Sequence, residues 1–196
     1  MHDRVHLQFR DLCRRYAVGG AVLEIGAVPD GSTLLALPEL SGAKSRLGIN
    51  LDGPASFGGF EIVGGNANAM PFADGAFDLV LCNATLEHDP RFWLTLTEMR
   101  RVLRVGGIAM IGVPGYVRGS GMWAKLAGVA GRVLRSAWLD GVAASTPVLL
   151  VHDFPGDYYR FSEQALREVL FEGFELLEQR AVMAPPRLIG VGRKLG

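Results

Sequence analysis

Short apolar runs recur along this chain, separated by segments with helical spacing of apolar residues, and this alternation constrains the fold most. The first run, residues 21–26, is apolar apart from Glu24 and ends at Gly26, the pattern of a strand buried on both faces. Similar runs predict strands at residues 46–51, 60–63, 77–82, 108–113, 174–180 and 188–191. Strands that alternate with helices form a parallel sheet covered by helices, so the sequence predicts an α/β fold with a doubly wound, mostly parallel sheet.

Three segments predict the covering helices. Residues 3–18 carry apolar side chains at three- and four-residue spacing, which indicates an amphipathic helix. A second helix follows Asp89, whose carboxylate can cap it, and is predicted to end at Gly106-Gly107. The third begins at Ser162 and extends to about Phe171.

Composition excludes several classes of protein. The 196 residues fit one domain, and 20 basic against 20 acidic side chains give no net charge, which argues against a nucleic-acid-binding protein. Cys13 and Cys82 form no disulfide framework and no metal cluster, so we expect no metal site and a reducing compartment. Because residues 1–4 begin no signal peptide and no run reaches about 18 apolar residues, we expect a cytoplasmic protein.

The segment after the first strand separates two kinds of nucleotide site. A dinucleotide fingerprint would place glycine at positions 26, 28 and 31, but position 28 is Val28, which disfavours a nicotinamide oxidoreductase. A phosphate-binding loop also fails, because no Gly-Lys-Ser/Thr follows. The segment offers Glu24 instead, whose carboxylate at the strand end can bind an ammonium group or a ribose hydroxyl and would repel a phosphate.

Five motifs in order carry a resemblance. They are Glu24-x-Gly26, Met70-Pro71-Phe72, Phe77-Asp78, Leu86-Glu87-His88, and Arg101-Val102-Leu103 with Gly106-Gly107. In this order and spacing the chain resembles the class I S-adenosylmethionine-dependent methyltransferases of the small-molecule type, over most of residues 21–114. The resemblance implies a Rossmann-like, seven-stranded sheet whose last strand, near residue 188, is antiparallel.

The resemblance also implies where S-adenosyl-L-methionine binds. Glu24 would serve the methionine amino group, while Gly26 and Ala27 form the turn against the cofactor. The second strand would end at the ribose, and the loop after the next strand would lie beside the adenine. Asn83 would lie near the transferring methyl group. The implied cofactor residues are Glu24, Gly26, Ala27, Asn50, Leu51, Asn66, Ala67, Asn68 and Asn83.

Four positions depart from the family pattern. Val28 and Asp30 stand where the family usually has glycine, and amides stand at Asn50 and Asn66 where it usually has acids. An amide still bonds hydroxyl groups, but without the charge. The departures leave two readings open: an active methyltransferase with an altered site, or a catalytically degenerate protein kept for binding or assembly.

Residues 152–162 supply the candidate acceptor site. They follow the fifth strand on the same edge as the cofactor turn, and similar Asp-Tyr-Tyr-Arg-Phe segments occur in this methyltransferase group. The candidate catalytic residues are His88, His152 and Tyr158, and the candidate substrate residues are Asp153, Tyr159 and Arg160. Each has a structural alternative, because methyl transfer often needs only alignment of donor and acceptor.

We therefore expect a single domain that methylates a small, partly apolar molecule. Its predicted parts are the N-terminal helix, the cofactor-binding core, an insertion or lid, and the rest of the sheet, at residues 1–20, 21–114, 115–157 and 158–196. Residues 122–139 read as a basic helix, for which a lid or a homodimer contact is more ordinary than a place on a membrane surface.

Overall fold

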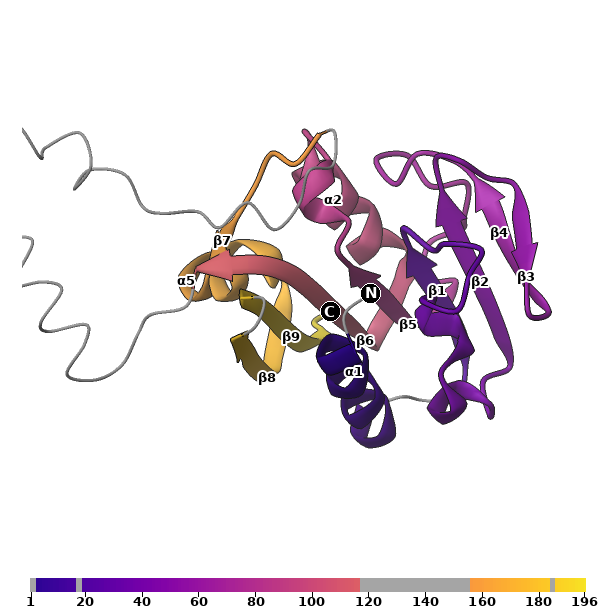
Figure 1. Cartoon of the computed structure of the whole chain (residues 1–196), viewed down its shortest axis with the longest axis horizontal. Helices are drawn as coiled ribbons and strands as arrows, with labels where there is room; N and C mark the ends of the chain where they lie inside the picture. The colour runs from indigo at the N-terminus through magenta and orange to yellow at the C-terminus, as the bar shows by residue number, and fades with distance from the viewer. Residues whose placement is uncertain (1–2, 17–18, 117–155, 184–185) are drawn as a thin grey trace, which may run out of the picture.

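The computed structural model describes residues 3–16, 19–116, 156–183 and 186–196, and one mixed β-sheet runs through this part of the chain (Figure 1). Its nine strands lie in the order β3-β4-β2-β1-β5-β6-β9-β8, with β7 paired to β6 outside this path. The strands are β1 (Ala21–Ile25), β2 (Ser45–Asn50), β3 (Ala55–Phe57), β4 (Phe60–Gly64), β5 (Phe77–Asn83), β6 (Leu103–Tyr116), β7 (Phe161–Ser162), β8 (Phe174–Met183) and β9 (Pro186–Lys194). The predicted Rossmann-like α/β fold is confirmed.

Strand direction follows the prediction. β4, β2, β1, β5 and β6 run parallel, whereas β9 runs antiparallel to both of its neighbours, β6 and β8. This confirms the antiparallel last strand near residue 188. Seven of the nine described strands have five residues or more and form the predicted sheet. The two that the sequence did not predict, β3 and β7, have three and two residues, too few to show a period.

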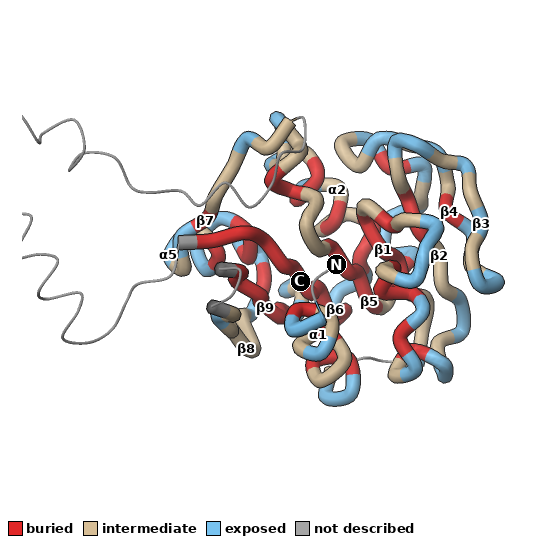
Figure 2. Tube along the Cα trace, viewed as in Figure 1, coloured by how far each residue is buried: buried red, intermediate tan, exposed pale blue. Residues whose placement is uncertain are grey.

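Helices cover both faces of the sheet. On one face α1 (Asp3–Tyr16) packs its buried Phe9 against a cluster that includes Val22 of β1 and Leu79 of β5. On the other face α2 (Phe92–Val102), α5 (Glu163–Ala165) and the π-helical turn η4 (Leu166–Leu170) cover a cluster that includes Leu23 and Val80. Successive strand residues thus alternate between two cores, and Figure 2 shows the buried strands between more exposed helices.

Two connections are shorter than an alternation of strands and helices implies. Between β1 and β2 the chain forms only two 3₁₀ turns, η1 (Leu34–Ala36) and η2 (Pro38–Leu40). Between β2 and β4 it forms β3, which pairs antiparallel with β4 in place of a helix. The carboxyl edge is therefore framed by short loops on this side of the sheet.

Helix α2 ends earlier than the sequence predicted. It stops at Val102, and Leu103 already pairs with Phe77 of β5, so Gly106-Gly107 lie inside β6. Gly106 has a φ of +75°, and the pairing of β5 with β6 is irregular at this point. The prediction was wrong because a glycine pair fits a strand irregularity as well as a helix end, and pairing with β5 decided between them.

The predicted cap at Ser162 is confirmed. Its hydroxyl oxygen accepts a hydrogen bond of 3.0 Å from the Ala165 N–H at the start of α5. Among the described residues, no helix has the length and apolar character needed to span a membrane. The predicted helix at 122–139 lies outside the described residues.

Candidate functional site

The predicted cofactor positions lie in a row across the carboxyl edge of the sheet. The pairing register places Asn50 of β2, Gly26 after β1 and Asn83 of β5 side by side. Asn66 follows β4, two residues after Gly64, which is the partner of Asn50. Since neighbouring strands lie about 4.8 Å apart, the row from β4 to β5 spans about 14 Å. Because β1 pairs with β2 on one side and β5 on the other, the row crosses the switch point where such sheets bind ligands.

Gly26 is required by the fold of the protein itself. Its φ is +77°, in the left-handed region, and a Cβ at this position would lie 2.2 Å from the Thr85 Oγ1. The Thr85 hydroxyl donates to the carbonyl of Ile25 at 3.2 Å, so Thr85 closes over the turn from the end of β5. The turn and the loop after β5 therefore form one packed unit.

The Glu24 carboxylate is buried and fully engaged with its own chain. It accepts hydrogen bonds from the Thr33 hydroxyl at 2.5 Å and from the N–H groups of Leu34 and Leu35 at 3.1 and 3.2 Å. Burial raises the pKa of this carboxyl, and these three hydrogen bonds act in the opposite direction. In this structure Glu24 holds the start of η1 against the end of β1.

Asn50 links the ends of β1 and β2. Its side-chain amide donates to the carbonyl of the buried Ala27 at 2.7 Å, and its oxygen accepts from the Asp52 N–H at 3.3 Å. The next residue, Leu51, is 72% exposed at the edge. An ionised acid at position 50 could not donate to the Ala27 carbonyl. This hydrogen bond gives a structural reason for an amide at position 50.

The loop after β4 is tied to α2. The Asn68 amide donates to Asp89 Oδ2 at 2.7 Å and to the Thr95 hydroxyl at 2.9 Å. Asn66 is exposed and Ala67 is half-buried. Of the loop residues predicted to contact the cofactor, Asn66 is thus the exposed one, while Ala67 packs against the hydrophobic core and Asn68 fixes the loop to the helix.

Two of the sequence motifs meet in a clamp beside this loop. Glu98 of α2 accepts from the Met70 N–H at 2.6 Å and pairs with Arg101 at 2.8 Å. Arg101 donates to the carbonyls of Met70 and Phe72 at 3.0 and 2.7 Å and to the Asp74 carboxylate at 2.7 Å. In this chain Arg101 therefore ties the Met70-Pro71-Phe72 segment to the end of α2.

Of the predicted acceptor residues, Tyr158 and Tyr159 lie near the carboxyl edge of the sheet, in the part of the chain that the structure describes. The N–H groups of Tyr158 and Tyr159 both donate to the carbonyl of Glu87 in η3 (Leu86–His88), which follows β5. Tyr158 is 57% exposed, whereas the Tyr159 hydroxyl donates to the Pro90 carbonyl at 3.0 Å.

The remaining candidates play more local parts. Arg160 pairs with Asp157, three residues before it. His88 is half-buried in η3, the turn that follows the end of β5 at Asn83. His152 and Asp153 lie outside the described residues. Within the described ranges, no three His, Cys, Asp or Glu side chains gather as a metal site would require.

Sequence reasoning missed a buried ion pair at this edge. Arg187 of β9 donates through Nη1 to Glu87 Oε1 at 2.9 Å, and the two residues are only 9% and 2% exposed. Oε2 of Glu87 is buried and has no hydrogen-bond partner among the described residues. The partners are 100 residues apart, so no local pattern could have joined them.

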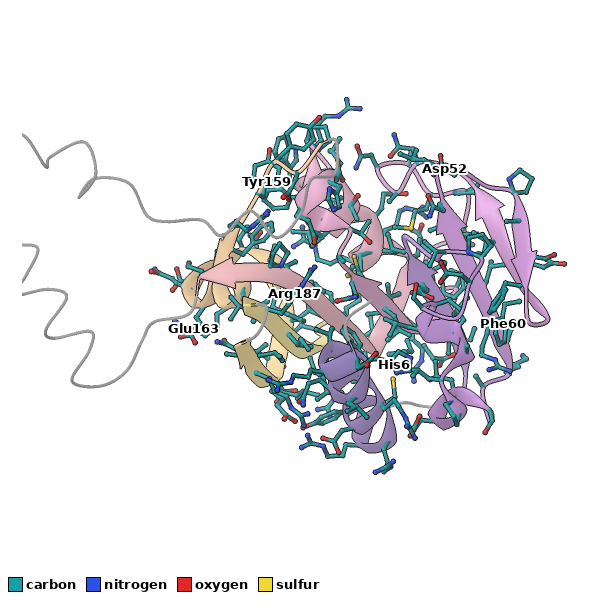
Figure 3. All side chains as sticks on the ribbon, in the orientation of Figure 1. His6, Asp52, Phe60, Tyr159, Glu163 and Arg187 are labelled. Atoms are coloured by element: carbon teal, nitrogen blue, oxygen red, sulfur yellow. The ribbon has the colours of Figure 1, made fainter. Side chains whose placement is uncertain are left out.

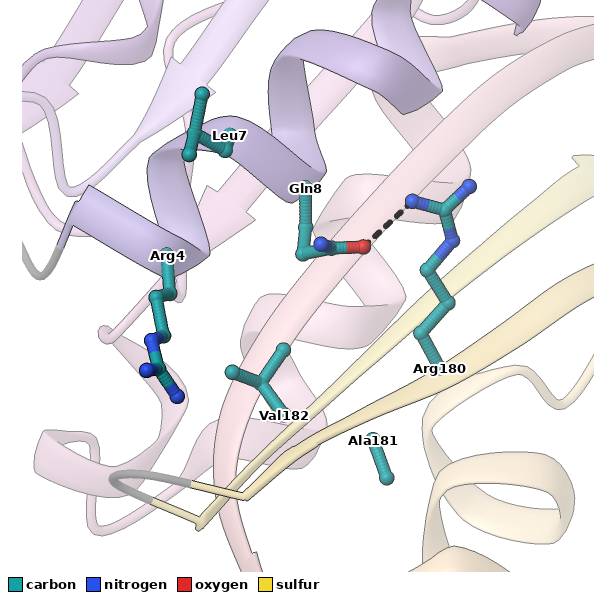
Figure 4. Close-up of a pocket in the computed structure, with 6 residues that line it drawn as sticks. All are labelled: Arg4, Leu7, Gln8, Arg180, Ala181 and Val182. Carbon is teal, nitrogen blue, oxygen red and sulfur yellow. Dashed lines mark hydrogen bonds between the residues drawn. The ribbon is translucent and has the colours of Figure 1, made fainter.

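Two surface hollows lie away from the row. One lies between α1 and β8 and is lined by Arg4, Leu7, Gln8, Arg180, Ala181 and Val182 (Figure 4). The other lies beside β3 and β4, along residues 53–56 and 61–64. Neither contains a predicted site residue.

Several proteins similar to this chain are named methyltransferases. Residues 37–111 match the family described as a methyltransferase domain. A fatty-acid O-methyltransferase of Mycolicibacterium smegmatis is 38% identical over 96 residues, which cover 45% of this chain and 35% of that protein. An uncharacterized methyltransferase of Mycobacterium marinum is 43% identical over 60 residues, covering 30% of this chain and 24% of that protein. The chain thus spans about a quarter to a third of the length of these curated relatives.

Solved methyltransferases share the fold. An S-adenosylmethionine-dependent methyltransferase of Methanosarcina mazei superposes with a TM-score of 0.61 at 21% identity, covering 94% of this chain and 97% of that one. The 1,6-didemethyltoxoflavin-N1-methyltransferase of Burkholderia thailandensis, solved with bound 1,6-didemethyltoxoflavin and S-adenosylhomocysteine, superposes with a TM-score of 0.65 at 18% identity. That alignment covers 97% of this chain and 78% of the Burkholderia chain.

Proposed function

We propose that the chain is a class I S-adenosylmethionine-dependent methyltransferase and that it methylates a small, partly apolar molecule. The observation that carries the proposal is the row of Asn66, Asn50, Gly26 and Asn83 across the switch point of the sheet. The family resemblance implies these residues, and the strand register supports the proposal because it brings the ends of their strands side by side. When bound there, S-adenosylmethionine supplies a methyl group on a positively charged sulfur, open to direct displacement by a nucleophile.

The residues of the row fit such a cofactor. Leu51, 72% exposed at the end of β2, offers an apolar surface for an adenine ring, and the exposed Asn66 lies on the neighbouring loop for its polar edge. The positive φ of Gly26 turns the chain sharply away from the edge and leaves no side chain there. Asn83 ends β5 at the same level. Glu24 would contribute indirectly, because its hydrogen bonds to η1 fix the turn after β1.

Several features support a small acceptor that is partly apolar. Aromatic side chains gather at the edge where α2 begins. The ring centroid of Phe92 lies 5.0 Å from that of Tyr159 and 5.3 Å from that of Phe161. Trp93 and Tyr158 are exposed nearby in the chain. By their names, one relative and one structural neighbour act on a fatty acid and on 1,6-didemethyltoxoflavin, both small molecules. The balance of 20 basic and 20 acidic residues supports a small molecule over nucleic acid.

For methyl transfer the chain would mainly have to align the methyl donor with the acceptor. His88 and Tyr158 come from the two segments that cross at the Glu87 carbonyl, so they are placed to orient an acceptor or hold its proton. His152 stays a candidate for the same part. The compartment we propose is the cytoplasm, which agrees with the buried free thiols Cys13 and Cys82.

A second function is favoured by one specific observation. The Glu24 carboxylate and the Asn50 amide are both hydrogen-bonded to backbone groups of this chain. They therefore leave fewer polar groups for a cofactor than the family pattern implies. A catalytically degenerate protein, kept for binding or assembly, would show this arrangement.

Calorimetry with S-adenosylhomocysteine separates the two functions. We expect binding to the wild-type protein and, because an apolar contact is lost, about tenfold weaker binding to Leu51→Asp. Leu195→Asp is the matched control, since Leu195 is 53% exposed near the C-terminal end, and it should bind as the wild type does. No binding at millimolar ligand would refute the enzyme and favour the degenerate protein.

A further inference from the structure

The Glu87–Arg187 pair occupies the reactive end of the sheet. Asn83 of β5 is the register partner of Gly112 in β6, and two residues further along the strand Pro114 is the partner of Arg187. Residues two apart on a strand share a face, and a Cβ at Gly112 would lie 2.5 Å from the Asn83 Oδ1. The side chains of Arg187 and Asn83 therefore project from the same face at the carboxyl edge, and Figure 3 shows Arg187 beside β6.

Arg187 has more donors than the described residues use. A guanidinium carries five N–H donors in a planar fork, and Glu87 Oε1, bonded to Nη1, is the one acceptor recorded for Arg187 within the described part of the chain. Because the hydrogen bond to Glu87 uses Nη1, the N–H groups of Nε and Nη2 remain on the other edge of the guanidinium. Their spacing matches the two oxygens of a carboxylate. The Arg187 side chain is 11% exposed, so this edge is shielded from most of the solvent.

Stability does not explain the pair. Removing two charges from water is expensive, and apolar residues of similar volume are often as stable or more stable. Here the expense is larger because Glu87 Oε2 lacks a hydrogen-bond partner among the described residues. A buried cation kept at this expense beside the methyl-transfer edge indicates a role in binding.

We propose that Arg187 anchors the carboxylate of the methyl acceptor, with Glu87 as the positioning residue that fixes its guanidinium. This inference rests on the proposed methyltransferase function and specifies the acceptor class as a carboxylate on an apolar body. Glu87 sets the strength of the anchor, because its negative charge partly cancels that of Arg187.

Substitutions of the two partners should change carboxylate binding in opposite directions. A pair with a merely structural role would not produce this difference. Arg187→Gln removes the anchor, so a carboxylate should bind about 10- to 100-fold more weakly. Glu87→Gln keeps an oxygen for Arg187 but removes the opposing charge, so the same carboxylate should bind several-fold more tightly.

Calorimetry with decanoate, in saturating S-adenosylhomocysteine, tests the proposal, with decan-1-ol as the probe that lacks the charge. We expect decanoate to follow the two opposite shifts and decan-1-ol to change less than about twofold. The matched controls are Arg10→Gln and Glu39→Gln, which alter an Arg–Glu pair of 3.1 Å between α1 and η2, away from the carboxyl edge. Should a single variant fail to fold, the neutral double variant Glu87→Gln/Arg187→Gln must still lose decanoate binding.

Three outcomes overturn the proposal: no decanoate binding by the wild type, unchanged binding by Arg187→Gln, or equal weakening by both single variants. Binding of S-adenosylhomocysteine is measured first in every variant. Its loss in the wild type refutes the methyltransferase function, whereas the decanoate result bears on the anchor alone.

Discussion

Gly26→Ala should destabilise the protein even when no ligand is present. The left-handed φ of +77° costs a residue with a Cβ about 1–2 kcal/mol, and the new Cβ would lie 2.2 Å from Thr85 Oγ1 and 3.0 Å from its Cγ2. Overpacking of this kind costs about 1–3 kcal/mol, because threonine is branched at Cβ and rotates poorly. The free energy of unfolding should fall by about 3.5 kcal/mol in total.

A double-mutant cycle isolates the contact. Thr85→Ala removes both close atoms and the hydrogen bond to Ile25, and should cost about 1 kcal/mol alone. The double variant should then lose about 2.5 kcal/mol, less than the two single losses together, so the coupling is about 2 kcal/mol.

Urea unfolding followed by circular dichroism measures each corner of the cycle. Gly31→Ala is the control from the same loop, since a Cβ there meets nothing within 4 Å, and it should change the free energy of unfolding by less than about 0.5 kcal/mol. Additivity within about 0.5 kcal/mol would refute the contact. An unchanged stability of Gly26→Ala would show that the glycine serves a ligand alone.

Three further predictions concern stability and reactivity. The hydrogen bond from Arg104 holds the pKa of Asp78 below its ordinary 3.8, so its stabilisation is present above about pH 4 and is lost in acid. Asp78→Asn should therefore be less stable than the wild type at about pH 7, with the gap closing toward about pH 2 in chemical denaturation, whereas a constant gap would contradict the ionic origin. Arg101→Met should lower the free energy of unfolding by about 2 kcal/mol and speed amide hydrogen exchange in the loop before β5, so unaltered exchange would exclude the clamp. Burial raises the pKa of Cys13 to about 12 and also raises that of Cys82, so neither thiol should react with an aromatic disulfide reagent before urea is added, and rapid reaction of the folded protein would disprove this.

Local pattern was enough for the seven longer strands of the sheet and for the position of its carboxyl edge. A buried strand such as β1 shows its burial in an uninterrupted apolar run, and the residue after it lies at the carboxyl edge whatever the rest of the chain does. Sequence therefore placed Gly26, Asn50 and Asn83 on one edge, and the register confirms that they are neighbours. It failed at Gly106, where cross-strand pairing with β5 overrode a local helix-ending signal.

Tertiary structure alone decided what each side chain at that edge binds. The sequence shows that Glu24 and Asn50 are polar groups at strand ends, but their partners in η1 and the first turn depend on how the short connections fold back. The Glu87–Arg187 pair joins residues 100 positions apart, and only the antiparallel insertion of β9 beside β6 brings them together. Periodicity records which face of an element is buried, whereas hydrogen-bond and ion-pair partners are fixed by the packing of elements that are distant in the chain.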